Sequence, residues 1–230
     1  WEKEAIELAK SNSTTSLLSS LLIISILHYY QRDIQLIENY FNVIKTNLLN
    51  PQRDVAQASA AVLHYFFEED SDITIFLKQV VTIADNIFQK RNTQIYYNAL
   101  LILSTVGKFI TEDVFQVTTK IIPELLSCIF GPNDVIRHEA IKVFFIHVKT
   151  LPDELASFIE GIVFDCRKEI SSNDESKVLG SILLIKKIYP IASIHIQPQT
   201  FISQIHTNFE LFSPELSIQA IDLIIFFVNV

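Results

Sequence analysis

The feature that most constrains this chain is a small residue that recurs inside apolar helical segments every 39 to 41 residues. An aliphatic residue stands three positions after each of them. A period of this size in a helical pattern is typical of stacked helix pairs, in which each repeat buries its apolar face against its neighbours. The small residues are Ser19, Ala60, Ala99, Ala140, Gly180 and Ala220. The aliphatic residues are Leu22, Leu63, Ile102, Val143, Leu183 and Leu223.

The period predicts an all-α fold of the HEAT or armadillo type, a right-handed α-solenoid of about five to six antiparallel helix pairs. We expect residues 1–230 to form a single solenoid segment, because nothing in the sequence indicates a β-strand or a domain boundary. Both ends stop inside the repeat pattern, so we expect an excerpt of a longer solenoid. The small residues should mark close contacts between helices. Four of the aliphatic residues should be almost fully buried: Leu63, Ile102, Val143 and Leu183.

The repeat at 111–150 shows how the helices should begin and end. Gly131 and Pro132 end its first helix, because proline has no N–H to donate and glycine relaxes the turn. Asp134 is expected to cap the second helix. Pro123 falls inside the first helix and predicts a kink. Further along, residues 190–200 are expected to form an irregular linker, and Pro214 to begin the last helix.

Composition limits the partners and the compartment. The net charge of −8 argues against nucleic acid or an anionic membrane as the main partner. The apolar runs 17–30 and 216–230 are shorter than the roughly 20 residues that a bilayer needs. We therefore expect them to be buried helices, with no membrane insertion. Cys128 and Cys166 lack a CxxC spacing and should be buried free thiols, as in a cytoplasmic protein.

The sequence carries none of the local patterns of catalysis or cofactor binding. It has no phosphate-binding loop, dinucleotide fingerprint, zinc-protease motif or nucleophile elbow. The acidic turn at 68–72 could resemble a cation site, although acidic turns between helices are common. We expect no cofactor, no metal and no catalytic activity in this chain.

One set of polar residues falls at matching places in the repeats. Arg137 is expected to pair with an aspartate in a neighbouring turn, as part of a ladder between layers. It could alternatively face a partner protein. Lys177 occupies the same place one repeat later. The candidates for the ladder are Asp54, Asp134, Arg137, Asp174 and Lys177.

These residues carry a resemblance to a known family. Pro123, the run Asp134-Val135-Ile136-Arg137 and Ala140 resemble the HEAT-repeat consensus. The segments 98–103, 129–140 and 175–188 are similar to consecutive repeats in the N-terminal HEAT solenoid of target-of-rapamycin (TOR) kinases. The outer helices match only in their hydrophobic pattern.

The resemblance to TOR kinases implies a non-catalytic scaffold in TOR signalling that contacts raptor-type subunits. It also implies an oligomer that forms through the parent protein. The serine/threonine kinase domain of such a parent would lie outside this segment, so no catalytic residue carries over. The alternative is a HEAT-repeat transport or coat adaptor, such as an importin-like carrier. An enzyme that uses the acidic turn is a third, weaker hypothesis.

Overall fold

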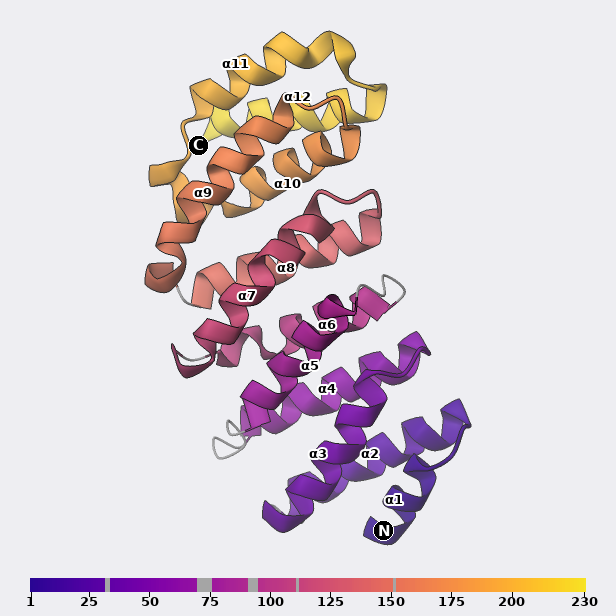
Figure 1. Cartoon of the computed structure of the whole chain (residues 1–230). Helices are drawn as coiled ribbons and strands as arrows, with labels where there is room; N and C mark the ends of the chain where they lie inside the picture. The colour runs from indigo at the N-terminus through magenta and orange to yellow at the C-terminus, as the bar shows by residue number, and fades with distance from the viewer. Residues whose placement is uncertain (32–33, 70–75, 91–94, 111, 151) are drawn as a thin grey trace. The chain divides into compact units, whose positions relative to one another are not determined.

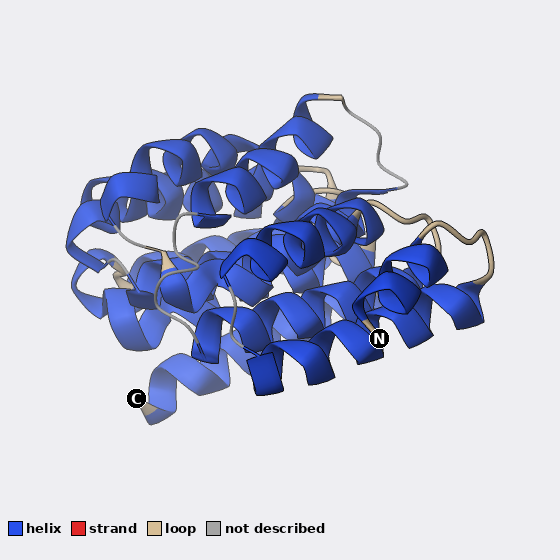
Figure 2. Cartoon of the chain, turned by 90° about the horizontal axis from the view of Figure 1, so that it is seen from below, coloured by secondary structure: helices blue, strands red, loops and turns tan. Residues whose placement is uncertain are grey.

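The structure, a computed structural model, describes residues 1–31, 34–69, 76–90, 95–110, 112–150 and 152–230. These residues contain twelve α-helices and a few short 3-10 turns. No strand occurs among them (Figure 2). The all-α prediction is therefore confirmed for the described part of the chain.

The chain divides into two compact units, Trp1–Thr118 and Thr119–Val230. The division falls inside helix α7 (Glu112–Ile129). Figure 1 labels the helices in order along the chain.

In unit 1, consecutive helices pack as pairs: α1 on α2, α3 on α4, and α5 on α6. The even-numbered helices also contact one another in succession, α2 with α4 and α4 with α6. The helices are α1 (Glu2–Ala9), α2 (Thr14–Gln31), α3 (Ile34–Leu48), α4 (Arg53–Glu69), α5 (Leu77–Gln89) and α6 (Tyr96–Val106), followed by the 3-10 helix η3 (Gly107–Phe109).

Unit 2 shows the same succession of even-numbered helices, because α10 contacts both α8 and α12. Helix α9 packs on α10, and α11 packs on both α9 and α12. After the end of α7, the helices are α8 (Asp134–Thr150), α9 (Pro152–Ile170), α10 (Glu175–Ala192), α11 (Pro198–Asn208) and α12 (Pro214–Asn229), with the 3-10 helices η4 (Ser193–His195) and η5 (Phe209–Leu211).

Spacing of apolar residues explains which faces are buried. In α5 the buried positions recur at helical spacing and form one stripe. They are Leu77, Val80, Val81, Ala84, Ile87 and Phe88. The other core helices follow the same rule, so each pair closes over a shared apolar interior.

Polar residues before the first turn start three of the even-numbered helices. The Asn133 side chain accepts the N–H of Ile136 at 3.1 Å and so caps α8. Asp174 caps α10, and Ser213 caps α12 just before Pro214. The expectation that Asp134 caps α8 is wrong, because Asp134 is already the first helical residue. The expected start of the last helix at Pro214 is confirmed.

Most of the recurring small residues lie in the core. Ala60, Ala99, Ala140, Gly180 and Ala220 are all buried. The predicted burial of Leu63, Ile102 and Val143 is confirmed, since none of the three exposes measurable surface.

The repeat register fails in two places. In α2, Leu22 is 62% exposed and Ser19 is half-buried. The buried small residue there is Ser20, whose hydroxyl donates to the Ala5 carbonyl of α1 at 2.7 Å. The register in α2 is therefore shifted by one residue. In α10, Leu183 is only half-buried, so its predicted near-complete burial is wrong.

The expected linker at 190–200 is largely helical. Helix α10 continues through Pro190 to Ala192, and η4 and α11 follow almost at once. Pro190 has no N–H for the Lys186 carbonyl, which normally breaks a helix. Burial of Ile188 and Ala192 on either side of Pro190 holds this turn against the unit 2 core. Pro123 lies inside α7 as expected.

The two apolar runs are buried on one face only, which corrects the expectation of buried helices. In α12 the outward residues Ile218, Ile225 and Val228 are exposed. Among the described residues, one other helical segment, Glu175–His195, is long and apolar enough to cross a membrane by length and composition. Because 44% of its most apolar stretch is buried among other helices, it also fits a core helix.

The close approach of α10 to the end of α7 gives a test by glycine substitution. A Cβ on Gly180 would lie 3.0 Å from the Ile129 carbonyl carbon and nearer still to its oxygen. Because backbone atoms cannot give way like a flexible side chain, Gly180→Ala should lower the free energy of unfolding by about 1–3 kcal/mol.

Gly161 in the middle of α9 is the matched control. A Cβ there meets nothing within 4 Å. Gly161→Ala should therefore stabilise by about 0.5–1 kcal/mol through helix propensity. Urea unfolding followed by circular dichroism measures both, and equal effects of the two substitutions would contradict the close contact.

Candidate functional site

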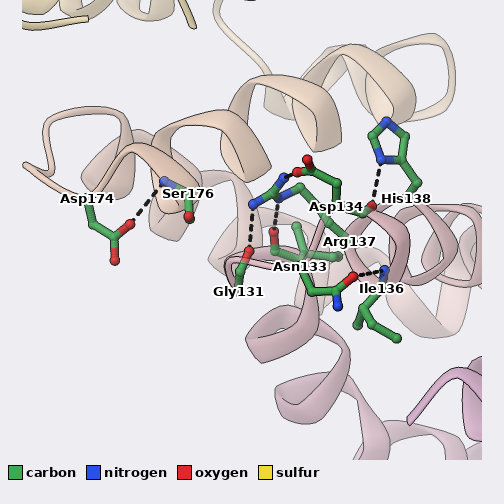
Figure 3. A network of polar contacts seen from close by, with 9 residues as sticks. Gly131, Asn133, Asp134, Ile136, Arg137, His138, Asp174 and Ser176 are labelled. Carbon is green, nitrogen blue, oxygen red and sulfur yellow. Dashed lines mark hydrogen bonds and ion pairs between the residues drawn. The ribbon is translucent and has the colours of Figure 1, made fainter. Parts of the chain in front are cut away.

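Arg137, in the first turn of α8, is the largest fully buried side chain among the described residues and is only 1% exposed. Its Nε donates to the Ile129 carbonyl at 3.2 Å, and its Nη2 donates to the Gly131 carbonyl at 2.6 Å. Its Nη1 pairs with the Asp134 carboxylate one turn earlier (Figure 3). The guanidinium therefore joins the start of α8 to the end of α7.

One of the two carbonyls that Arg137 contacts, that of Ile129, is the last in α7, and the other, that of Gly131, lies two residues beyond the helix. The last four carbonyls of an α-helix have no intrahelical donor, and they form the negative end of the helix dipole. A buried guanidinium supplies both donors and positive charge at this point. Arg137 is therefore a cap for α7, and the structure favours the structural hypothesis for it over direct contact with a partner.

The predicted ladder between layers does not form around Arg137. Its acidic partner, Asp134, lies on its own helix and not in a neighbouring turn. Lys177 instead pairs with Glu169 of α9 at 3.4 Å. Asp174 caps its own helix by accepting the Ser176 N–H at 3.0 Å, and Asp54 is exposed in the first turn of α4. The five candidates are thus dispersed among local roles.

Unit 1 contains a comparable cap that the sequence analysis missed. The Asn98 side chain of α6 is buried and donates to the carbonyls of Leu48 and Asn50, both at 3.0 Å. These carbonyls lie at the end of α3. The signal in the sequence is a single amide inside the apolar segment 95–103, immediately before Ala99.

A groove lies beside Arg137 and Asp134, on the surface of the even-numbered helices of unit 2. Its first part, of about 400 Å³, is lined mainly by the N-terminal turns of α8, α10 and α12. A second part, also of about 400 Å³, continues along the same helices and shares His138 and Leu183 with the first. We call the two parts together the unit 2 groove.

The two parts of the unit 2 groove differ in charge. Three acidic residues, Asp134, Glu175 and Glu215, line the first part. Two lysines line the second part. Lys186 pairs with Asp222 of α12, and the Lys187 ammonium lies 4.7 Å from the centre of the Phe145 ring. The lysine contacts link α10 to its two neighbours along the groove.

Unit 1 presents an aromatic surface on α2 and α4. A depression of about 520 Å³ there is lined by Ile26, Tyr29, Tyr30, Val62 and Tyr65, among others. Tyr29 is 58% exposed and packs edge-to-face against Tyr30, with ring centres 5.1 Å apart. Solvent-exposed aromatic residues of this kind are common where proteins bind one another.

Burial favours the neutral forms of three titratable side chains in the core, those of His147, Cys128 and Cys166. Burial lowers the pKa of His147, although a hydrogen bond between its Nδ1 and the Val143 carbonyl opposes this. Burial raises the pKa of the Cys128 thiol to about 12, helped by the nearby charge of Glu124. Burial also raises the pKa of Cys166. Both cysteines are free and buried, as predicted.

Metal-ligating residues do not gather in the described part of the chain. No group of three or more histidine, cysteine, aspartate or glutamate side chains is found there. Of the acidic turn at 68–72, Glu68 lies in the last turn of α4, which ends at Glu69, and pairs with His64 at 3.0 Å. Residues 70–72 lie outside the described residues.

Comparison with known proteins adds no relative. No protein-family model matches the chain, and no curated protein matches its sequence.

The role of Arg137 can be separated from that of its ion pair. Arg137→Met should lower the free energy of unfolding by about 2–4 kcal/mol, because two carbonyls lose their donors and the Asp134 charge loses its partner. Asp134→Asn should cost only about 0–1 kcal/mol, since the Asp134 side chain is 74% exposed. Denaturant unfolding of both variants measures the difference. A loss with Asp134→Asn as large as that with Arg137→Met would show that the ion pair dominates.

His147 predicts a loss of stability in mild acid. Because its pKa is lowered in the folded chain, the unfolded chain binds a proton more readily as pH falls below about 6.5. Stability is therefore complete above that pH and decreases as pH falls toward the lowered value. His147→Gln should flatten the change in unfolding free energy between about pH 7 and pH 5. His138→Gln, an exposed site on the same helix, is the control, and an unchanged slope in His147→Gln would refute the assignment.

Proposed function

We propose that this chain is a segment of a HEAT-type α-solenoid that acts as a non-catalytic scaffold for protein–protein interaction. The observation that carries the proposal is the succession of even-numbered helices within each unit, which leaves a groove or an aromatic surface open to solvent. A stack of this kind exposes a long surface, and the packing of the core determines the shape of that surface.

The proposal extends to the arrangement of the whole chain. The period of the small residues continues across the division between the units, from Ala99 to Ala140. On this basis we propose one continuous, right-handed solenoid segment over residues 1–230. Contacts of α2 with α4 and of α8 with α10 support the same stacking rule within each unit.

Exposed apolar side chains support the interaction role. Tyr30 is 77% exposed, and the outward face of α12 adds Ile218 and Val228. Contiguous exposed apolar surface on a folded chain commonly marks a place where another macromolecule binds. The net charge of −8 favours a basic or mixed protein surface as the partner over nucleic acid.

The narrower proposal is that the parent protein is a cytoplasmic TOR-like kinase, and that raptor-type subunits are the partners. It rests on the similarity of the segments 98–103, 129–140 and 175–188 to consecutive repeats in the N-terminal HEAT solenoid of TOR kinases. The transport or coat adaptor, an importin-like carrier, is the alternative, and the same stacking of helices supports it equally.

A capture experiment tests these proposals. The 230-residue chain, immobilised through a tag, is exposed to purified raptor-type subunits and, separately, to importin-type cargo and coat components. We expect the raptor-type subunits to bind, and binding to weaken as salt is raised from about 50 to about 300 mM, because screening reduces the attraction of an acidic chain.

The outcomes separate the alternatives. Binding of cargo or coat components in place of raptor-type subunits would support the adaptor. Binding of none of them would contradict both interaction roles in the form stated here.

A further inference from the structure

We propose that the unit 2 groove binds a short peptide segment of a partner protein, in which two aliphatic side chains have a basic residue on one side. The aliphatic side chains lie in the middle of the groove, around Leu183. The basic residue lies toward the N-termini of α10 and α12. The inference rests on the interaction role proposed above and names a surface and a class of ligand for it.

The middle of the groove is suited to aliphatic side chains. Leu183 is half-buried and lines both parts, so it lies where they meet. Leu179 and Leu216 continue the apolar lining on one side, and Phe145 and Phe226 continue it on the other. A groove of this size that is lined by aliphatic and aromatic groups can cover two medium-sized apolar side chains.

The position of Leu183 departs from the repeat rule. The equivalent residues Leu63, Ile102 and Val143 are fully buried, whereas Leu183 keeps part of its surface in solvent. Burying that apolar surface would be favourable, and a ligand in the groove would achieve this.

The acidic residues at one end of the groove determine where the basic residue of the peptide lies. Asp134 is paired with Arg137, so the negative charge at this end comes from Glu175 and Glu215, both exposed. The Glu175 carboxylate accepts the Ser213 N–H at 3.0 Å and is thereby held at the rim. The positive ends of the α10 and α12 dipoles offset only about half of the negative charge of each glutamate. A lysine or arginine of the peptide would complement this acidic rim.

The opposite part of the groove disfavours a second basic residue. The charge of Lys186 is offset by the Asp222 carboxylate. The Lys187 ammonium lies over the Phe145 ring, which carries no negative charge to offset it. A peptide whose basic residue faced this part would meet the Lys187 ammonium. The difference between the two parts therefore favours one orientation of the bound segment.

Binding would need little rearrangement of the groove. Helix α10 contacts both α8 and α12 directly, and the two lysine contacts link it to them along the groove. Arg137 holds the first turn of α8 against the end of α7. Surfaces that are already ordered lose less entropy when they bind, which favours recognition of a short segment.

The test uses the full chain and three short fluorescein-labelled peptides. All three carry two leucines with a pair of residues on one side only, which is lysine and arginine, two serines, or aspartate and glutamate. Fluorescence anisotropy should give the tightest binding for the basic peptide, with the acidic peptide at least about 10-fold weaker.

Substitutions locate the binding in the groove. Glu215→Lys should weaken the basic peptide by about 5- to 10-fold and leave the serine peptide nearly unchanged, because it reverses one rim charge. Glu160→Lys, an exposed site on α9 outside the groove, makes the same charge change and should have little effect. Leu183→Ala should weaken all three peptides, whereas Leu22→Ala on the exposed face of α2 should not.

The folded state of each variant is checked by its thermal unfolding, so that a loss of binding is not a loss of fold. Tighter binding of the acidic peptide, or equal effects of Glu215→Lys and Glu160→Lys, would overturn the inference. Self-association of the chain that Leu183→Ala abolishes would also overturn it, since the occupant would be a second copy. If raptor-type or adaptor partners bind equally well to Leu183→Ala, the groove inference fails while the interaction role stands.

Discussion

The structure depends on how the backbone carbonyls at the ends of odd-numbered helices find hydrogen-bond donors. A helix end that is buried without donors is costly, and each unit meets this constraint with a residue from an even-numbered helix. In unit 2, Arg137 of α8 donates to two carbonyls at the end of α7. In unit 1, Asn98 of α6 donates to two carbonyls at the end of α3. These contacts fix the position of each even-numbered helix along its neighbour.

Gly180 belongs to the same constraint. It lies against the Ile129 carbonyl that Arg137 also contacts, where a Cβ could not be accommodated without movement of the backbone. The guanidinium and the glycine therefore place α8 and α10 on the same helix end. With these two helices positioned, α12 packs on α10, and the three helices together form the unit 2 groove.

Apolar surface is distributed unevenly among the even-numbered helices. In unit 1, α4 lies between α2 and α6 and contacts both, whereas α2 leaves Tyr30 in solvent; in unit 2, α12 leaves Val228 in solvent. Leu183 is a third case, because it is central in the chain of contacts and still partly exposed. These surfaces are what the chain offers to other molecules, and their chemistry is aliphatic and aromatic with an acidic rim in unit 2.

The sequence by itself determined the helical class, the start of the last helix at Pro214 and the burial of residues such as Ala99 and Val143. Those properties follow from local spacing of apolar residues and from caps and prolines. Tertiary structure alone decided the partners of Arg137, the role of Asn98, the one-residue shift to Ser20 and the exposure of Leu183. It also decided that α10 continues through Pro190. Each of these depends on which helices are neighbours and on how far they are offset along their axes. A periodic pattern that repeats along the chain carries no information about either.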